Sequence, residues 1–174
     1  MQSVELLLDA AAHASVVGQW QALADAGLPS QAHHQGTTNA PHVTVGLASA
    51  IDEAAEARMA AAGRHLPLSL TLGAPLLFGN SGRVVLARMV VVTDGLLALH
   101  GMVSQALASS PGQVEHLRVG RWVPHVTIAR RIDADALGPA LRALGEDGMG
   151  TLEAEATTLR RWDGDAKQAW TVGA

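Results

Sequence analysis

Short apolar runs alternate with alanine-rich or polar segments along this chain, a pattern that predicts strands alternating with helices. Aspartate or threonine marks the helix starts, and glycine marks most of the helix ends. For the first half the pattern predicts, in order, a strand at 4–9, a helix from 10 to Gly27, a strand at 41–48, a helix from Asp52 to Gly63, and two strands at 66–73 and 74–79.

The same order of elements returns in the second half. The pattern predicts a strand at 84–92, a helix capped by Thr93 or Asp94 that ends near Ala108, a strand at 121–129, a helix capped by Asp133 or Asp135 that ends at Gly145, and two strands at 150–162 and 166–172. The segment Gly79–Gly82 is typical of a turn and is expected to join the halves.

Each half is therefore predicted to run strand, helix, strand, helix, strand, strand. Such an internal repeat is typical of two similar lobes related by a pseudo-twofold axis. We predict one α+β domain of two lobes, about 1–79 and about 83–174, with two antiparallel-rich sheets, one per half, around a central cleft. No linker rich in proline, glycine and serine separates the halves, so they should pack together.

One short phrase is repeated on the second strand of each half, as PHVTV in the first and PHVTI in the second. Side chains two positions apart on a strand share a face, so His42 lies beside Thr44 and His125 beside Thr127. If the lobes face each other, both pairs converge on one cleft. Two opposed imidazoles can act as general acid and general base there, because histidine ordinarily titrates at about pH 6.5. The two hydroxyls can donate to phosphate oxygens.

A single His-x-Thr on a strand is an ordinary feature of a half-exposed sheet face. Two copies at matching positions point to function, because duplication of a fold retains its buried valines but not necessarily an outward polar pair. Adjacent His33 and His34 lie in a polar loop without neighbouring carboxylates and are expected at the surface or at the substrate rim. The remaining histidines have no partner pattern and are assigned structural roles: His13, His65, His100 and His116.

The composition of the chain disfavours several classes of binding partner. The 174 residues carry a net charge of −4, which disfavours a protein that holds long nucleic acid through many phosphates. The sequence contains no cysteine, so it offers neither disulfides nor thiolate metal sites. The N-terminus lacks a basic targeting segment, and no apolar run reaches the roughly 18–20 residues that span a bilayer. We expect a cytoplasmic protein without a membrane partner.

The paired HVTV and HVTI segments resemble the signature of the two-histidine (2H) phosphoesterase superfamily, and most closely its bacterial branch of 2′-5′ RNA ligases and RNA 2′,3′-cyclic phosphodiesterases. The resemblance implies a phosphodiesterase without metal or other cofactor that opens a 2′,3′-cyclic phosphate, with slow 2′-5′ ligation as the reverse reaction. It implies His42 as acid and His125 as base, Thr44 and Thr127 on the phosphate, and Arg130 as a third phosphate ligand.

The chain departs from the better-known members of this family in its aromatic content. It has no tyrosine and one phenylalanine, Phe78, so few side chains can stack on bases. Trp122 and Trp162 are the candidates for base stacking, although tryptophan is more often a core or rim residue. The expected partner is a small cyclic nucleotide or the 2′,3′-cyclic phosphate end of an RNA, bound by a monomer.

Three other functions stay open. The chain could be a binding module that holds RNA or a nucleotide without turnover, although a binder has no need of two opposed proton shuttles. It could be a structural protein, which the duplicated polar face disfavours. It could also be a zinc hydrolase that uses His42 and His125, but threonine is a poor zinc ligand and no third strong ligand is evident.

Overall fold

The computed structural model describes residues 1–79 and 82–173, so Asn80 and Ser81 of the predicted turn lie outside the described residues. The elements follow one another as β1 (Gln2–Leu8), α1 (Ala10–Asp25), β2 (His42–Ala48), α2 (Glu53–Gly63), β3 (Leu68–Gly79), β4 (Arg83–Val90), α3 (Asp94–Ala106), β5 (His125–Asp133), α4 (Leu137–Met149), β6 (Leu152–Asp163) and β7 (Gln168–Thr171). Three short 3-10 turns lie between them: η1 (Gln31–His33), η2 (Glu115–Leu117) and η3 (Ala134–Ala136).

The first three helices begin where their capping residues predicted. The Asp9 carboxylate accepts hydrogen bonds from the backbone N–H groups of residues 11 and 12, and the Asp52 carboxylate from that of residue 55. The Thr93 hydroxyl accepts one from residue 96, which decides between the two caps proposed for α3. Each cap satisfies N–H groups that the first helical turn would leave unpaired.

The start and end of α4 differ from the prediction. Neither Asp133 nor Asp135 caps it: the chain first makes the 3-10 turn η3, and the helix then starts after Ala136 without a side-chain cap. Gly145 has a φ of 59° and a ψ of −159°, which kinks the helix, but the chain continues helically to Met149. A glycine in this conformation interrupts the helical hydrogen bonds without having to end the helix.

The first half contains one long strand where two were expected. The sequence Gly73-Ala74-Pro75 suggested a break, but β3 runs unbroken from Leu68 to Gly79. The pairing of β3 with β4 shifts register between Leu72 and Pro75. A bulge of this kind accommodates a proline within a strand, because the local ladder hydrogen bond is already interrupted.

The strands form one seven-stranded sheet in the order β1-β2-β5-β4-β3-β6-β7, and every pairing is antiparallel. Strand β6 also pairs with β1, through residues 156–163, while residues 152–156 pair with β3. Strands from the two halves of the chain are therefore neighbours, and the prediction of two sheets, one per half, is wrong. A strand's own periodicity determines which face it buries but not which strand lies at its edge.

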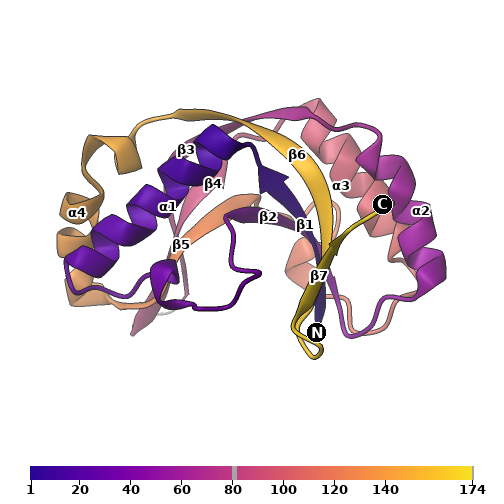
Figure 1. The fold of residues 1–174 in the computed structure, drawn as a ribbon, viewed down its shortest axis with the longest axis horizontal. Helices are drawn as coiled ribbons and strands as arrows, with labels where there is room; N and C mark the ends of the chain where they lie inside the picture. The colour runs from indigo at the N-terminus through magenta and orange to yellow at the C-terminus, as the bar shows by residue number, and fades with distance from the viewer. Residues whose placement is uncertain (80–81, 174) are drawn as a thin grey trace.

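The helices form two pairs on the sheet. Helix α1 packs against α4, and α2 packs against α3, so each pair combines a helix from each half of the chain. Figure 1 shows the two pairs at opposite ends of the molecule, with β2 and β5 between them and β6 arching over both. The sheet positions buried beneath the helices include two arginines, Arg88 against α1 and α4 and Arg161 against α2. Apolar buried positions of the sheet are Leu6, Val43, Val45, Leu70, Leu72, Leu86, Val90, Val126 and Ile128. Among the described residues, no helix has the length and hydropathy needed to cross a bilayer.

Candidate active site

The two repeated strands lie side by side in the middle of the sheet. Strands β2 and β5 are antiparallel neighbours, and Val43 is paired with Val126. Both valines are completely buried, so the residues on either side of each valine point to the opposite face of the sheet. The structure thereby brings the polar side chains of both repeats to one face: His42, Thr44, His125 and Thr127.

Both imidazoles are held in the same way. The Nδ1 atom of His42 lies 2.8 Å from the carbonyl oxygen of Ala40, and that of His125 lies 2.8 Å from the carbonyl oxygen of Val123. A carbonyl can only accept, so each Nδ1 carries a hydrogen and donates it. Proton exchange is therefore confined to Nε2 in both histidines. Both rings are half-buried, which leaves part of each accessible to a ligand.

A tryptophan indole donates a hydrogen bond to the backbone of each repeated motif. The Nε1 atom of Trp20, a buried residue of α1, donates to the backbone carbonyl of Thr127 over 3.1 Å. The Nε1 atom of Trp122 donates to the backbone carbonyl of Thr44 over 3.0 Å. One face of the Trp122 ring also stacks on His100, with ring centroids 4.0 Å apart. Trp122 therefore has a structural role, and base stacking by its ring stays a prediction.

The surroundings of His125 favour the neutral imidazole. Burial lowers its pKa, and the hydrogen bond to Val123 only partly opposes that effect. The positive charges of Arg130, His42 and His116 lower the pKa further. The Phe78 ring lies 4.5 Å from the imidazole and contributes to the apolar environment. A neutral imidazole with a free Nε2 can accept a proton at neutral pH.

A carboxylate lies beside His42. Its Nε2 atom lies 3.7 Å from the Oε1 atom of Glu5, a buried carboxylate of β1. The other oxygen of Glu5 accepts two hydrogen bonds from Arg160, 2.6 Å from Nη2 and 2.9 Å from Nε. The hydroxyl of Ser3 is hydrogen bonded to Oε1 over 2.6 Å. One histidine therefore faces an anion and the other a cation.

The other predicted residues lie around this face. Thr44 is half-buried and Thr127 is buried. Arg130 is exposed near the end of β5 and close enough to His125 to act on its charge. The Nε1 atom of Trp162 donates to the Thr38 hydroxyl over 3.2 Å. The loop residues His33 and His34 are exposed.

Reasoning from the sequence missed three residues beside the imidazoles. Glu5 and Arg160 come from the two ends of the chain and meet only because β1 pairs with β6. Glu5 carried a signal, since it is a lone charge inside the apolar run VELLLD. Arg160 and Phe78 carried none, because nothing in their local sequence indicates the strand that lies opposite.

Within the described parts of the chain, no three or more histidine, aspartate or glutamate side chains converge as a metal site would require. The expected independence from metal stays a prediction and needs the chelation experiment given below.

The α+β fold and the two adjacent His-x-Thr strands define a protein of the two-histidine class. The family model of the 2′-5′ RNA ligase superfamily matches residues 9–166, so the chain belongs to this superfamily, as the repeated motif predicted. No curated protein matches the sequence.

Solved structures show the same fold at low sequence identity. The structure of Kluyveromyces marxianus Usb1 is 12% identical, has a TM-score of 0.52, and covers 98% of this chain and 96% of its own. The structure of the same Usb1 with uridine monophosphate is 13% identical, has a TM-score of 0.51, and covers the same shares. At this identity the likeness concerns the fold.

Proposed function

We propose that this protein is a metal-independent phosphodiesterase that opens a 2′,3′-cyclic phosphate on a small nucleotide or at an RNA end. His125 acts as general base and His42 as general acid. Membership of the 2′-5′ RNA ligase superfamily supports phosphodiester chemistry, and opening of the cyclic phosphate by a 5′-hydroxyl in place of water would join two RNA ends through a 2′-5′ bond.

The proposal rests on one observation. Two imidazoles on the same sheet face have Nδ1 bound to a carbonyl and Nε2 not so bound, and their charged neighbours differ: Glu5 lies beside His42, and Arg130 acts on His125. General acid–base catalysis needs one group that accepts a proton and one that gives a proton at the same pH. Here a carboxylate oxygen of Glu5 lies 3.7 Å from Nε2 of His42, whereas burial and the charge of Arg130 lower the pKa of His125.

The proposed step balances with these two groups. Nε2 of His125 takes a proton from water while the water oxygen attacks phosphorus. The bond from phosphorus to one ribose oxygen breaks, and that oxygen takes the proton from Nε2 of His42. The hydroxyls of Thr44 and Thr127 donate to the remaining phosphate oxygens as negative charge grows on them. The product is a phosphomonoester beside a free hydroxyl.

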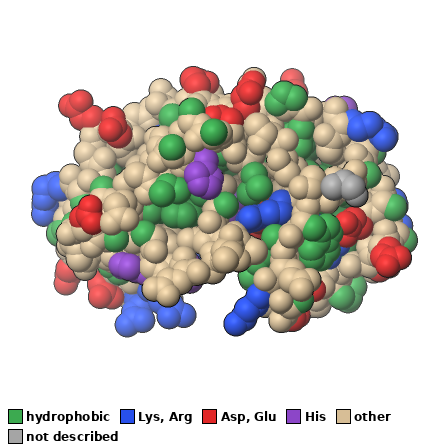
Figure 2. All heavy atoms as spheres, in the orientation of Figure 1, with side chains coloured by type: hydrophobic (Ala, Val, Ile, Leu, Met, Phe, Trp, Pro, Cys, Tyr) green, Lys and Arg blue, Asp and Glu red, His purple; other side chains and the backbone are tan. Residues whose placement is uncertain are grey.

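The net negative charge of the protein favours a small substrate over a long RNA. The net charge is −4, and on the face of the molecule drawn in Figure 2 hydrophobic side chains lie around the centre and most charged side chains lie toward the rim. A long basic track would favour extended RNA. The structure of Usb1 with uridine monophosphate shows a nucleotide on a protein of this fold, which supports a nucleotide ligand. Trp162, on the far side of Arg160 along β6, is the candidate for contacting its base.

The test is a turnover assay in EDTA. The purified protein is offered the four 2′,3′-cyclic mononucleotides and a short RNA with a cyclic end, and the position of the product phosphate is determined. We expect ring opening in the chelator at the rate seen without it. Binding without ring opening would favour the binding module, and activity that is lost in EDTA and restored by zinc would favour a metal hydrolase.

A further inference from the structure

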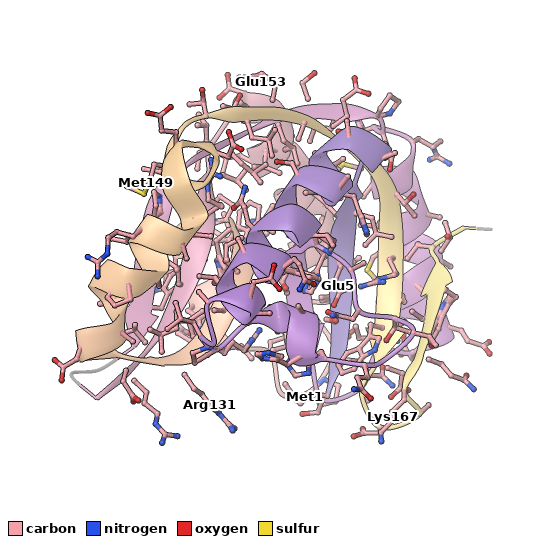
Figure 3. The ribbon with its side chains drawn as sticks, turned by 60° about the vertical axis from the view of Figure 1, so that its left-hand side comes forward. Met1, Glu5, Arg131, Met149, Glu153 and Lys167 are labelled. Atoms are coloured by element: carbon pink, nitrogen blue, oxygen red, sulfur yellow. The ribbon has the colours of Figure 1, made fainter. Side chains whose placement is uncertain are left out.

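A buried ion pair adjoins the proposed acid and takes no part in the proton transfer itself. Glu5 and Arg160 are 4% and 9% exposed and are joined by two hydrogen bonds. In Figure 3 the buried Glu5 lies near the middle of the view, whereas Glu153 and Lys167 lie at its edge.

The pairing of the strands puts this ion pair on the face that carries the histidines. Glu5 is opposite Thr44 on β2 and opposite Arg160 on β6. Paired residues in antiparallel strands point to the same face, so Arg160, Glu5 and the His42–Thr44 pair form one row across three strands. The carboxylate stands between the guanidinium and the imidazole, with one oxygen toward each.

Stability alone is a weak reason for this arrangement. Removing two charges from water is costly, and replacing a buried ion pair by apolar side chains of similar volume is often neutral or stabilising. The arrangement does have a consequence for His42: Arg160 holds one oxygen of the carboxylate, and the other oxygen lies 3.7 Å from Nε2.

We propose that Glu5 and Arg160 are positioning residues that place a carboxylate beside Nε2 of His42 and so assign this histidine the acid role. The inference rests on the proposed function, because it deepens the roles given to the two histidines. At 3.7 Å the carboxylate is too far away to accept a hydrogen bond from Nε2, so the proton stays available to a leaving oxygen.

Arg160 also acts on the other side of the ring. Its Nη1 donates to the backbone carbonyl of Thr38 over 3.0 Å, in the loop that leads into β2. Two residues later, the carbonyl of Ala40 accepts from Nδ1 of His42. The same guanidinium therefore orders the carboxylate that faces Nε2 and the loop that holds Nδ1.

The charged groups that face this imidazole come from three strands: Glu5 on β1, Arg160 behind it on β6, and His125 on β5. Only Glu5 favours a positive charge on His42. Neutralising Glu5 should therefore make His42 lose its proton at a lower pH. The pKa of His125 depends on burial and Arg130 and should be unaffected.

The experiment compares Glu5→Gln with the wild type in two measurements. In the pH profile of kcat/KM we expect the alkaline limb to move down by about one pH unit and the acidic limb to stay in place. In ¹H–¹⁵N spectra of the side chain, the His42 ring should change to its neutral form at a correspondingly lower pH. Glu153→Gln is the control, because it removes an exposed carboxylate of β6 and should leave both measurements unchanged.

Glu5→Gln leaves Arg160 buried without its partner and could unfold the chain. The double variant Glu5→Gln/Arg160→Met removes both charges and should show the same shift, while Glu5→Asp should restore part of the wild-type profile. An unmoved His42 transition in the folded variants would overturn the inference, as would a shift of the acidic limb alone. Should the wild type open no cyclic phosphate, the proposed function fails, and the ring titration still tests the link between Glu5 and His42.

Discussion

At the level of single residues, the two histidines share a geometry and differ in their surroundings. Each Nδ1 is tied to the carbonyl two positions earlier, so each Nε2 is the exchangeable atom. Their difference comes from the carboxylate of Glu5 beside His42 and from burial and the charge of Arg130 at His125. Identical motifs can thus take opposite parts in one proton transfer.

This argument predicts the effect of removing either ring. His42→Ala and His125→Ala should each lower kcat by about 10²–10⁴-fold, the usual range for a general acid or base. Because the two act in one step, the double variant should be little worse than either single one. The measurement is kcat on a cyclic mononucleotide.

Circular dichroism and urea midpoints provide the control for these variants. Both rings are half-buried at the surface of the sheet, so truncation should leave the fold intact. Folded single variants that retain more than about a tenth of the wild-type kcat would contradict the general acid–base assignment.

At the level of elements, each motif strand is fixed by groups from elements distant in sequence. Trp20 on α1 holds β5, and Trp122, in the loop before β5, holds β2. Behind Trp122 lies His100 of α3, which is 1% exposed and hydrogen bonded to the Leu117 carbonyl of η2. The packing of α3 against Trp122 therefore includes a buried imidazole, that of His100, and burial lowers its pKa.

We expect the fold to lose stability as the pH falls below about 6.5, the ordinary value for histidine. Burial lowers the pKa of His100, and burial lowers that of His125 too, so in this range the unfolded chain binds more protons than the folded one. The stabilising contribution of these two histidines is complete above their pKa in the unfolded chain, and it is lost as the pH falls through their lower pKa in the folded protein. A second loss should begin near pH 4, because backbone hydrogen bonds lower the pKa of Asp9.

Urea midpoints at pH 7, 6 and 5 measure the first loss. His100→Phe keeps a ring to stack on Trp122 but cannot titrate, so its midpoint should fall less between pH 7 and pH 5 than that of the wild type. Parallel midpoints in the two proteins would show that His100 is not the source of the acid sensitivity.

At the level of the whole molecule, the chain halves are intermixed. Strand β2 of the first half adjoins β5 of the second, and β6 spans β3 and β1, both from the first half. Each helix pair likewise joins the halves. The site therefore belongs to the complete sheet, and neither half could form it alone.

The charge of the whole molecule predicts a preference for short substrates. With a net charge of −4, long RNA gains little from additional phosphates. We expect kcat/KM for a cyclic mononucleotide to match that for an RNA with the same cyclic end within about tenfold. Because few phosphates are contacted, kcat/KM should change less than about tenfold between about 50 and 200 mM salt. Much faster turnover of long RNA, falling steeply with added salt, would show an extended RNA-binding surface instead.

The sequence by itself determined most of the local elements and named the candidate catalytic residues. Capping residues fix helix starts within a few positions, and the two-residue period of a strand puts His42 with Thr44, and His125 with Thr127, on one face. It also determined the family through these motifs. Only the tertiary structure decided that β3 is one strand, that the halves share one sheet, and that Glu5 and Arg160 adjoin His42. The physical reason is that strand pairing depends on hydrogen bonds between distant segments, which no local pattern of apolar and polar residues encodes.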